Sequence, residues 1–339
     1  MHVKPTKILI LSLFYLFTSK LTAQDIPTFT QFFTNPYMYN PAYAGLEGRS
    51  TFVLTHHRQW IGINDAPVTT NFLYHTALKF GVNLGANITQ DEFGIFKTTS
   101  GLLTFGYTVS LGWNHFISFG ISGGSAFNNL DLSEGVNLND PALAGVLENS
   151  ISLAGNAGIA YHISNFNIGF ALPNLFKTAT YSTIDFDKGE FDALTNFNVT
   201  ADYMIYFADG QNALEPYFLY RSYQGIPSQF EGGAIFHYKE VFWLGGGYRQ
   251  DFGYMGMLGL KLNYGLSIGY AFEYSATSIS GINLTSHEIQ ISFLLGDPIP
   301  RKENYATFLD NTMRIRPIKV KKEEPKKENR PRFEHEFDD

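Results

Sequence analysis

The fold of this chain is decided by a short alternating stretch at residues 80–88, which reads FGVNLGANI. Side chains two positions apart lie on the same face of a β-strand. One face of this stretch therefore carries Phe80, Leu84 and Ile88, while the other carries only glycine and asparagine. A soluble β-sandwich places Lys, Glu and Thr on its outer face. Small polar residues instead suit the lumen of an outer-membrane barrel whose apolar face meets lipid.

The same alternation recurs along most of the chain, in segments separated by Gly, Pro, Asn or Asp. An even number of segments near ten residues in length is typical of a closed bacterial outer-membrane barrel. The sequence therefore predicts an all-β fold, a transmembrane antiparallel outer-membrane β-barrel of about 14 strands. The expected strands are residues 51–59, 67–77, 79–90, 98–111, 114–124, 150–163, 165–172, 192–207, 213–222, 227–238, 241–249, 254–263, 265–274 and 286–295.

The composition excludes several other classes of protein. Only 16% of the 339 residues are charged, against roughly 25% in an average protein. Aromatic residues make up 16%, which is too apolar for a disordered chain. No charge-free apolar run reaches the roughly 18 residues of a spanning helix. Residues 24–300 hold 10 basic and 22 acidic residues, a balance that argues against nucleic acid as a partner. The absence of cysteine excludes disulfides and thiolate metal sites.

Charge and proline divide the chain into four parts. Residues 1–23 combine two early lysines with a ten-residue apolar run, the pattern of a signal peptide for export. Residues 24–50 lack alternation and are rich in Pro, Asn and Tyr, so we expect an N-terminal segment that lies at the periplasmic rim or plugs the lumen. Residues 51–296 form the barrel. Residues 297–339 carry mixed charge and are expected to be a mobile periplasmic tail.

Motifs for catalysis or metal binding are lacking in the sequence. The adjacent His56 and His57 point to opposite faces of a regular strand and cannot share one metal ion. The acidic stretch 185–192 lacks the frame of an EF-hand loop. We therefore expect no catalytic, cofactor-binding or metal-binding residues and no enzymatic activity. Aromatic residues that are candidates for the girdle at the membrane interfaces are Tyr74, Tyr107, Tyr161, Trp243 and Tyr248.

Several motifs resemble one known family. Residues 40–45 read NPAYAG and are preceded by QFFTNPYMYN; RQW follows at residues 58–60 and AP at residues 66–67. Later pieces occur in the same order: FWLGGGYR at 242–249, GLSIGYAFEYS at 265–275 and SHEI at 286–289. Together they resemble the PorP/SprF family of type IX secretion system membrane proteins from Bacteroidetes, over residues 25–296. The residues that carry this resemblance are Asn40, Pro41, Ala42, Tyr43, Gly45, Arg58, Gln59, Trp60, Pro67, Arg249, His287 and Glu288.

The resemblance implies a non-enzymatic role in the outer membrane. Members of the family are thought to help export large secreted proteins or adhesins, or to hold them at the cell surface, in some cases for gliding motility. The implied partners are membrane lipid, the C-terminal domain of a large secreted substrate, and periplasmic components of the apparatus. One departure is the extension after Gly296. Because of it, the chain does not end on the aromatic residue of a last strand, and the barrel-assembly machinery must recognise an internal strand at 286–295.

Two other functions remain open from the residues alone. An outer-membrane barrel can be a diffusion or uptake channel for small or hydrophobic solutes, and some barrels carry a hydrolase triad on their strands. We also predict that NPAYAG packs against the barrel itself, because its Pro, Gly and Tyr content suits a packed turn.

Overall fold

The chain folds into one closed antiparallel sheet. The computed structural model describes residues 28–112, 115–130, 150–175, 195–208, 211–224, 226–239, 241–275, 284–299 and 307–309. The strands are β1 (Ser50–Arg58), β2 (Val68–Ala77), β3 (Val82–Phe93), β4 (Phe96–Gly112), β5 (His115–Leu130), β6 (Ser150–Ile163), β7 (Phe166–Leu172), β8 (Phe197–Tyr203), β9 (Ile205–Tyr206), β10 (Ala213–Tyr223), β11 (Ile226–Tyr238), β12 (Phe242–Arg249), β13 (Gly253–Lys261), β14 (Leu266–Ser275) and β15 (Thr285–Leu295).

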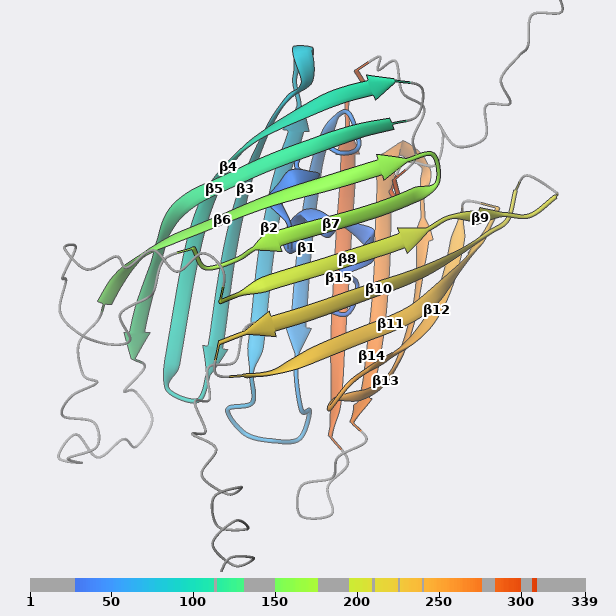
Figure 1. Cartoon of the computed structure of the whole chain (residues 1–339). Helices are drawn as coiled ribbons and strands as arrows, with labels where there is room; N and C mark the ends of the chain where they lie inside the picture. The colour runs from blue at the N-terminus through green and yellow to red at the C-terminus, as the bar shows by residue number, and fades with distance from the viewer. Residues whose placement is uncertain are drawn as a thin grey trace, which may run out of the picture.

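Each strand pairs with its neighbours in the sequence, and the first strand pairs with the last (Figure 1). The register of this closing pair runs from Ser50 opposite Leu295 to Arg58 opposite His287. Strands β8 and β9 both pair with β10 and are separated only by Met204, so they form one strand of the barrel. The result is a closed barrel of 14 strands, which confirms the predicted fold class. Closure satisfies every strand edge within the sheet.

The two ends of the barrel differ in the length of the connections between strands. One end, which we call the short-turn end, also holds the start of β1 and the end of β15; its connections include residues 78–81, 164–165, 239–241 and 262–265. The opposite end, which we call the long-loop end, has long connections at residues 59–67, 131–149, 173–196 and 276–284, beside short ones at residues 94–95, 224–225 and 250–252. Strand β5 continues to Leu130, beyond residue 124, where we expected this strand to end.

The outer wall is apolar along its whole circumference. The large side chains of the alternating stretches face outward, as Leu84, Ile88, Leu103 and Phe105 do. The inward positions between them hold small or polar residues such as Asn83. This is the arrangement of a barrel whose outside contacts lipid acyl chains.

Trp243 corrects one prediction. We expected it at a membrane interface, but its side chain is 1% exposed and lies inside the barrel. The neighbouring Leu244 faces outward. Trp243 and Tyr248 are five positions apart on one strand, so strict alternation puts them on opposite faces. Of these two residues, only Tyr248 is exposed on the outer face, where a girdle residue must lie.

The position of Phe105 leads to a first prediction. Phe105 lies in the middle of β4, on the outer wall, and is 53% exposed. Replacing it with arginine should lower the free energy of unfolding by about 2–4 kcal/mol, because Phe105 lies near the membrane midplane. The matched control is Phe80→Arg, since Phe80 is 91% exposed in the turn before β3 and the cost near an interface is about 0–1 kcal/mol. Denaturant titrations in phospholipid vesicles measure both, and equal costs would contradict the assignment of Phe105 to lipid.

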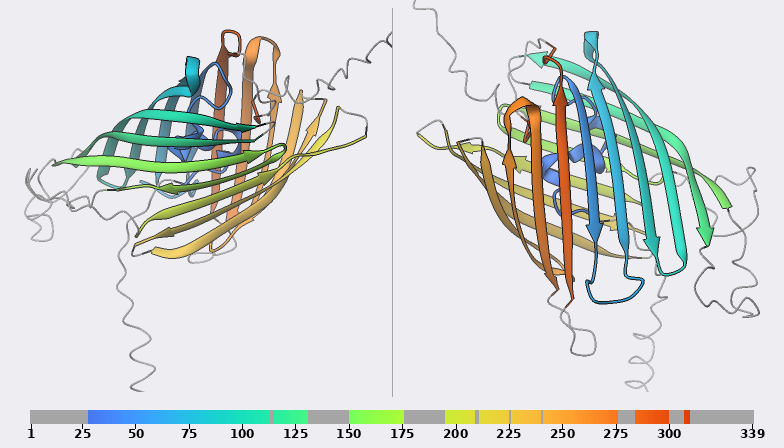
Figure 2. Two further views of the ribbon diagram at one scale, coloured as in Figure 1. Left: turned by 45° about the horizontal axis from the view of Figure 1, so that its top comes forward. Right: turned by 180° about the vertical axis from the view of Figure 1, so that it is seen from behind.

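The N-terminal segment lies inside the barrel. Residues 28–49, which we call the plug, are enclosed by the strands (Figure 2, blue). The plug contains three short 3₁₀ turns, η1 (Phe32–Thr34), η2 (Pro36–Met38) and η3 (Pro41–Tyr43). Two further turns of this kind, η4 (Lys79–Gly81) and η6 (Asn263–Gly265), connect strands at the short-turn end.

No helix among the described residues is long and apolar enough to cross a membrane. The expected signal peptide at 1–23, the acidic stretch 185–192 and most of the tail at 297–339 lie outside the described residues.

Candidate functional site in the barrel lumen

The repeated Asn-Pro pairs of the plug explain its local shape. Asn35 and Asn40 each stand before a proline and cap a 3₁₀ turn, in which the asparagine side chain accepts a hydrogen bond from the backbone N–H two residues on. For Asn40 this bond comes from Ala42 and measures 2.9 Å. Asparagine is a favoured capping residue, and proline at the first turn position has no N–H to leave unpaired. The plug is therefore a chain of tight turns rather than a strand.

Glycines in the wall let the plug approach the sheet closely. A Cβ atom added at Gly120 would lie 2.2 Å from the carbonyl carbon of Pro41, and one at Gly158 would lie 2.0 Å from Oδ1 of Asn40. At Gly169 the nearest atom would be the Tyr43 hydroxyl oxygen, at 2.6 Å. The small residues that alternate along β5, β6 and β7 thus form the surface on which NPAYAG lies.

This close contact predicts a specific sensitivity at Gly120. The Cβ atom of an alanine there would overlap with the Pro41 backbone, which cannot move aside as a flexible side chain can. We therefore expect the free energy of unfolding to fall by about 1–3 kcal/mol. Gly123 on the same strand has no atom within 4 Å of its added Cβ, and Gly123→Ala is the matched control. Thermal unfolding of both variants in detergent measures the difference. Equal stability of the two variants would show that the plug does not rest on β5.

Polar groups of the plug bind directly to the wall. The Tyr37 hydroxyl is 2.7 Å from Oγ1 of Thr104, and the Tyr43 hydroxyl is 3.3 Å from Oγ1 of Thr200. The Asn40 side-chain amide donates to the carbonyl oxygens of Ile159 and Phe170 at 3.2 and 3.3 Å. Burial raises the pKa of the Tyr37 phenol to about 12, so the phenol stays neutral at alkaline pH as well. These bonds join the plug to β4, β6, β7 and β8.

Gly45 ends the family motif in a conformation that favours glycine. Its φ is +70°, and its N–H donates to Nδ1 of His75 at 3.0 Å. The accepted bond identifies Nδ1 as the unprotonated nitrogen of a neutral imidazole. Oε2 of Glu47 lies 3.6 Å from the same nitrogen. The chain turns here toward β1, which begins at Ser50.

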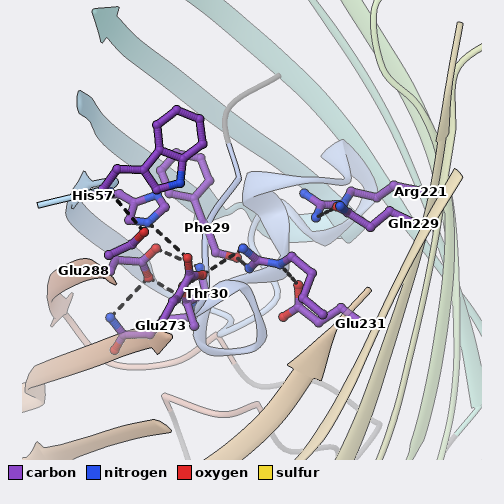
Figure 3. Close-up of polar contacts among 12 residues, drawn as sticks. Phe29, Thr30, His57, Arg221, Gln229, Glu231, Glu273 and Glu288 are labelled. Atoms are coloured by element: carbon purple, nitrogen blue, oxygen red, sulfur yellow. Dashed lines mark hydrogen bonds and ion pairs between the residues drawn. The ribbon is translucent and has the colours of Figure 1, made fainter. Parts of the chain in front are cut away.

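The start of the plug is held by buried carboxylates on the last strands (Figure 3). Glu288 of β15 accepts the backbone N–H groups of Thr30 and Gln31 at 2.7 and 2.8 Å. It also accepts the side-chain amide of Gln31 at 3.2 Å. The Thr30 hydroxyl donates to Glu273 of β14. A carboxylate that accepts several N–H groups makes strong, charge-assisted bonds, so Glu288 fixes both the position and the direction of the entering chain.

Arg249 links Glu231 and Glu273 to the plug. Its Nε donates to Glu231 and its Nη1 to Glu273, both at 2.7 Å, while Nη2 donates to the backbone carbonyl of Phe29 at 3.3 Å. His57 is 3.7 Å from Glu273 on the other side. All four of these wall side chains are buried. A guanidinium offers several donors in one plane, which is what three separate acceptors require.

The residues that carry the family resemblance fall into three places. Asn40 to Gly45, Arg249 and Glu288 all lie in the lumen, but at different contacts: the first segment lies against β5 to β8, and the two wall side chains bind residues 29–31. Gln59 and Pro67 close the first connection at the long-loop end, where the Gln59 N–H donates to the Pro67 carbonyl at 2.9 Å and Trp60 is half-buried beside them. Arg58 and His287 are on the outer side of the wall. His287 is half-buried and packs edge-on against Phe272. The motifs therefore do not form one site.

Glu231, Glu273 and His57 are site residues that were not among the residues expected from the motifs, although Glu273 lies within GLSIGYAFEYS. The sequence did contain a signal for Glu273, because this residue occupies the face of its strand that otherwise carries Ser267, Gly269 and Ala271. A charged residue on the lumen-facing side of a strand needs a partner inside the barrel. Within the described part of the chain, no group of three or more His, Asp or Glu residues is placed to hold a metal ion.

Solved structures with a low degree of likeness to this chain include a hydrocarbon channel, a toluene transporter and an outer-membrane protein. The CymD monoaromatic hydrocarbon channel has a TM-score of 0.47 and 12% identity, covering 76% of this chain and 91% of its own. The toluene transporter TodX of P. putida has a TM-score of 0.44 and 11% identity, with coverage of 76% and 92%. Omp33 of Acinetobacter baumannii has a TM-score of 0.43 and 6% identity, with coverage of 74% and 100%. Comparison with curated proteins found no match.

A match to a family model identifies the family of this chain. The model for the type IX secretion system membrane protein PorP/SprF matches residues 21–293, which takes in the plug and nearly all of the barrel. The apolar outer wall and the closed sheet agree with a location in the bacterial outer membrane. The chain belongs to the PorP/SprF family of type IX secretion system membrane proteins.

Proposed function

We propose that this protein is a non-enzymatic anchor of the type IX secretion system, which assists the export of large secreted proteins or adhesins and holds them at the cell surface. The observation that carries this proposal is the occupied lumen. Residues 28–49 lie inside the barrel and bind the wall through Tyr37, Asn40 and the backbone N–H groups that Glu288 accepts. A barrel whose interior is filled and bonded offers a rigid platform in the membrane rather than a path for solutes.

The ends of the barrel suggest how the partners are arranged. Outer-membrane barrels have short periplasmic turns and longer extracellular loops. We therefore assign the short-turn end to the periplasm, where the C-terminal extension meets periplasmic components of the secretion system. The long-loop end then faces the outside, where the connections at 131–149 and 173–196 would contact the C-terminal domain of the secreted protein.

The competing function is a diffusion or uptake channel for small or hydrophobic solutes. It requires a continuous path through the lumen, and the plug lies across that path. Deletion of the gene separates the two functions. Loss of one large protein from the cell surface with unchanged solute uptake supports the anchor, and normal surface display with reduced uptake overturns it.

The surface contact is tested by complementing the deletion strain with variants. Replacing residues 131–149 with a Gly-Ser linker of equal length should abolish surface display of the secreted protein while the barrel still assembles. The same replacement at residues 321–339 lies in the extension assigned to the periplasm. It is the control for length in the purification, because it should leave the secreted protein bound to the barrel. Affinity purification from outer membranes should recover the secreted protein with the wild-type barrel and lose it with the loop variant. A purified barrel that hydrolyses phospholipid or peptide substrates would contradict the non-enzymatic role.

A further inference from the structure

A short piece of the C-terminal extension is buried inside the barrel. Thr307, Phe308 and Leu309 are 6%, 3% and 8% exposed, although they are outside every strand. They lie close to Trp243 and Lys261, which are at the short-turn end of β12 and β13. Residues 307–309 therefore lie inside the barrel near its short-turn end, where β15 also ends.

Phe308 fills a pocket made of aromatic rings from two sources. Its ring centroid is 5.4 Å from that of Trp243 and 5.1 Å from that of His237, which belong to the wall. On the other side it is 5.2 Å from the ring of Phe33, which belongs to the plug, with an interplanar angle of 67°. Edge-to-face aromatic pairs of this kind add attraction beyond the area that they bury. One side chain therefore joins the plug to the wall.

Lys261 holds the same segment through its backbone. Its ammonium group donates a hydrogen bond to the Phe308 carbonyl oxygen and lies 4.2 Å from the centroid of the Phe308 ring. The second contact is a cation–π interaction, which is stronger where water is excluded. The backbone and the side chain of Phe308 are thus recognised together, as in a peptide-binding site.

The extension also meets the other end of the plug. The Ile299 N–H donates to the Gly48 carbonyl at 2.8 Å, just before β1 begins. Two contacts, one through Ile299 and one through Phe308, therefore join the C-terminal extension to the plug. Residues 28–49 are bounded by the wall around them and by the extension at the short-turn end.

We propose that the aromatic pocket around Phe33, Trp243 and His237 is a docking site for residues 307–309 of the same chain, and that this segment is a latch that fastens the plug. Release of Phe308 would remove a ring from the side of Phe33 and leave an apolar opening beside the plug. The latch thereby couples the position of the C-terminal extension to the closed state of the lumen. This inference stands independently of the proposed anchoring function.

The latch is tested by the accessibility of a single cysteine in the plug. The chain has no native cysteine, so Met38→Cys, at a partly buried position, provides a clean reporter for a water-soluble maleimide. In the purified full-length barrel, Phe308→Ala should speed labelling at least tenfold, the change that a loss of about 1.4 kcal/mol produces. Phe333→Ala removes the same ring from the same extension and should leave the rate unchanged. Equal rates for the two variants would overturn the proposal.

A peptide added in trans separates docking from general loosening of the barrel. The peptide NYATFLDNT, which corresponds to residues 304–312, should restore slow labelling of the Phe308→Ala variant. The same peptide with alanine in place of its phenylalanine should have no effect. Fast labelling that neither peptide reverses would mean that Phe308 only stabilises the fold, and the docking site would be rejected. Heat-modified migration on gels confirms that each variant contains a folded barrel.

Discussion

Replacing Arg249 with methionine should lower the free energy of unfolding by about 3–5 kcal/mol, the cost of leaving a buried ion pair without one partner. The substitution removes the donor that lies between Glu231 and Glu273 and leaves both carboxylates inside the barrel without it. It also removes a donor to the Phe29 carbonyl, so the plug loses one of its attachments. Denaturant titration of the barrel in lipid vesicles measures the loss.

Arg58→Met is the matched control, because Arg58 is another arginine of the family motifs and is exposed on the outer wall. Its replacement should cost less than about 1 kcal/mol. A further variant checks the mechanism by replacing Glu231 and Glu273 with methionine together with Arg249. Since an apolar replacement of a whole buried ion cluster is often neutral or stabilising, much of the stability should return. If the single and triple variants were equally unstable, uncompensated charge could not be the cause.

Deleting residues 28–44 should open a conducting path through the barrel, and we expect the full-length protein to have none. These residues contain the three turns that occupy the lumen, and a barrel of this strand number is too wide for its own inward side chains to fill it. In planar lipid bilayers we expect steady current steps from the deletion variant and none from the full-length protein.

A deletion of equal length at residues 323–339 is the control, and it should leave the barrel closed. A folded barrel without its plug that still carried no current would show that other residues seal the lumen. These experiments can contradict the anchoring function and the role of the plug separately, because surface display is measured in cells and conductance is measured on purified protein.

The fold could be predicted from the sequence because its signal is local. Alternation between apolar and small residues needs only the period of a strand, and it indicated both the barrel and the side of each strand that meets lipid. The error at Trp243 came from setting this rule aside, since aromatic character was taken as evidence of an interface position. Its neighbour Leu244 faces outward, and the alternation alone would have placed Trp243 inside.

The lumen site could be predicted only in part. Residues 24–50 differ visibly from the strands, and a plug was one of the two places expected for them, yet their contacts depend on which distant residues the closed barrel brings together. Glu288 and Thr30 are 258 positions apart and form a bond of 2.7 Å. No short sequence motif contains both residues. Likewise, nothing in the charged sequence of the extension indicates that Phe308 is buried between the plug and the wall.

The sequence by itself determined the architecture, the faces of the strands and, through NPAYAG and RQW, the family. The tertiary structure alone decided that Arg249 lies between Glu231 and Glu273, that Glu288 holds the start of the plug, and that Phe308 packs on Phe33. The physical reason is the range of the interactions involved. Strand periodicity arises between neighbouring residues, whereas a buried charge or ring is satisfied by partners that become close only when β1 pairs with β15 and the barrel closes.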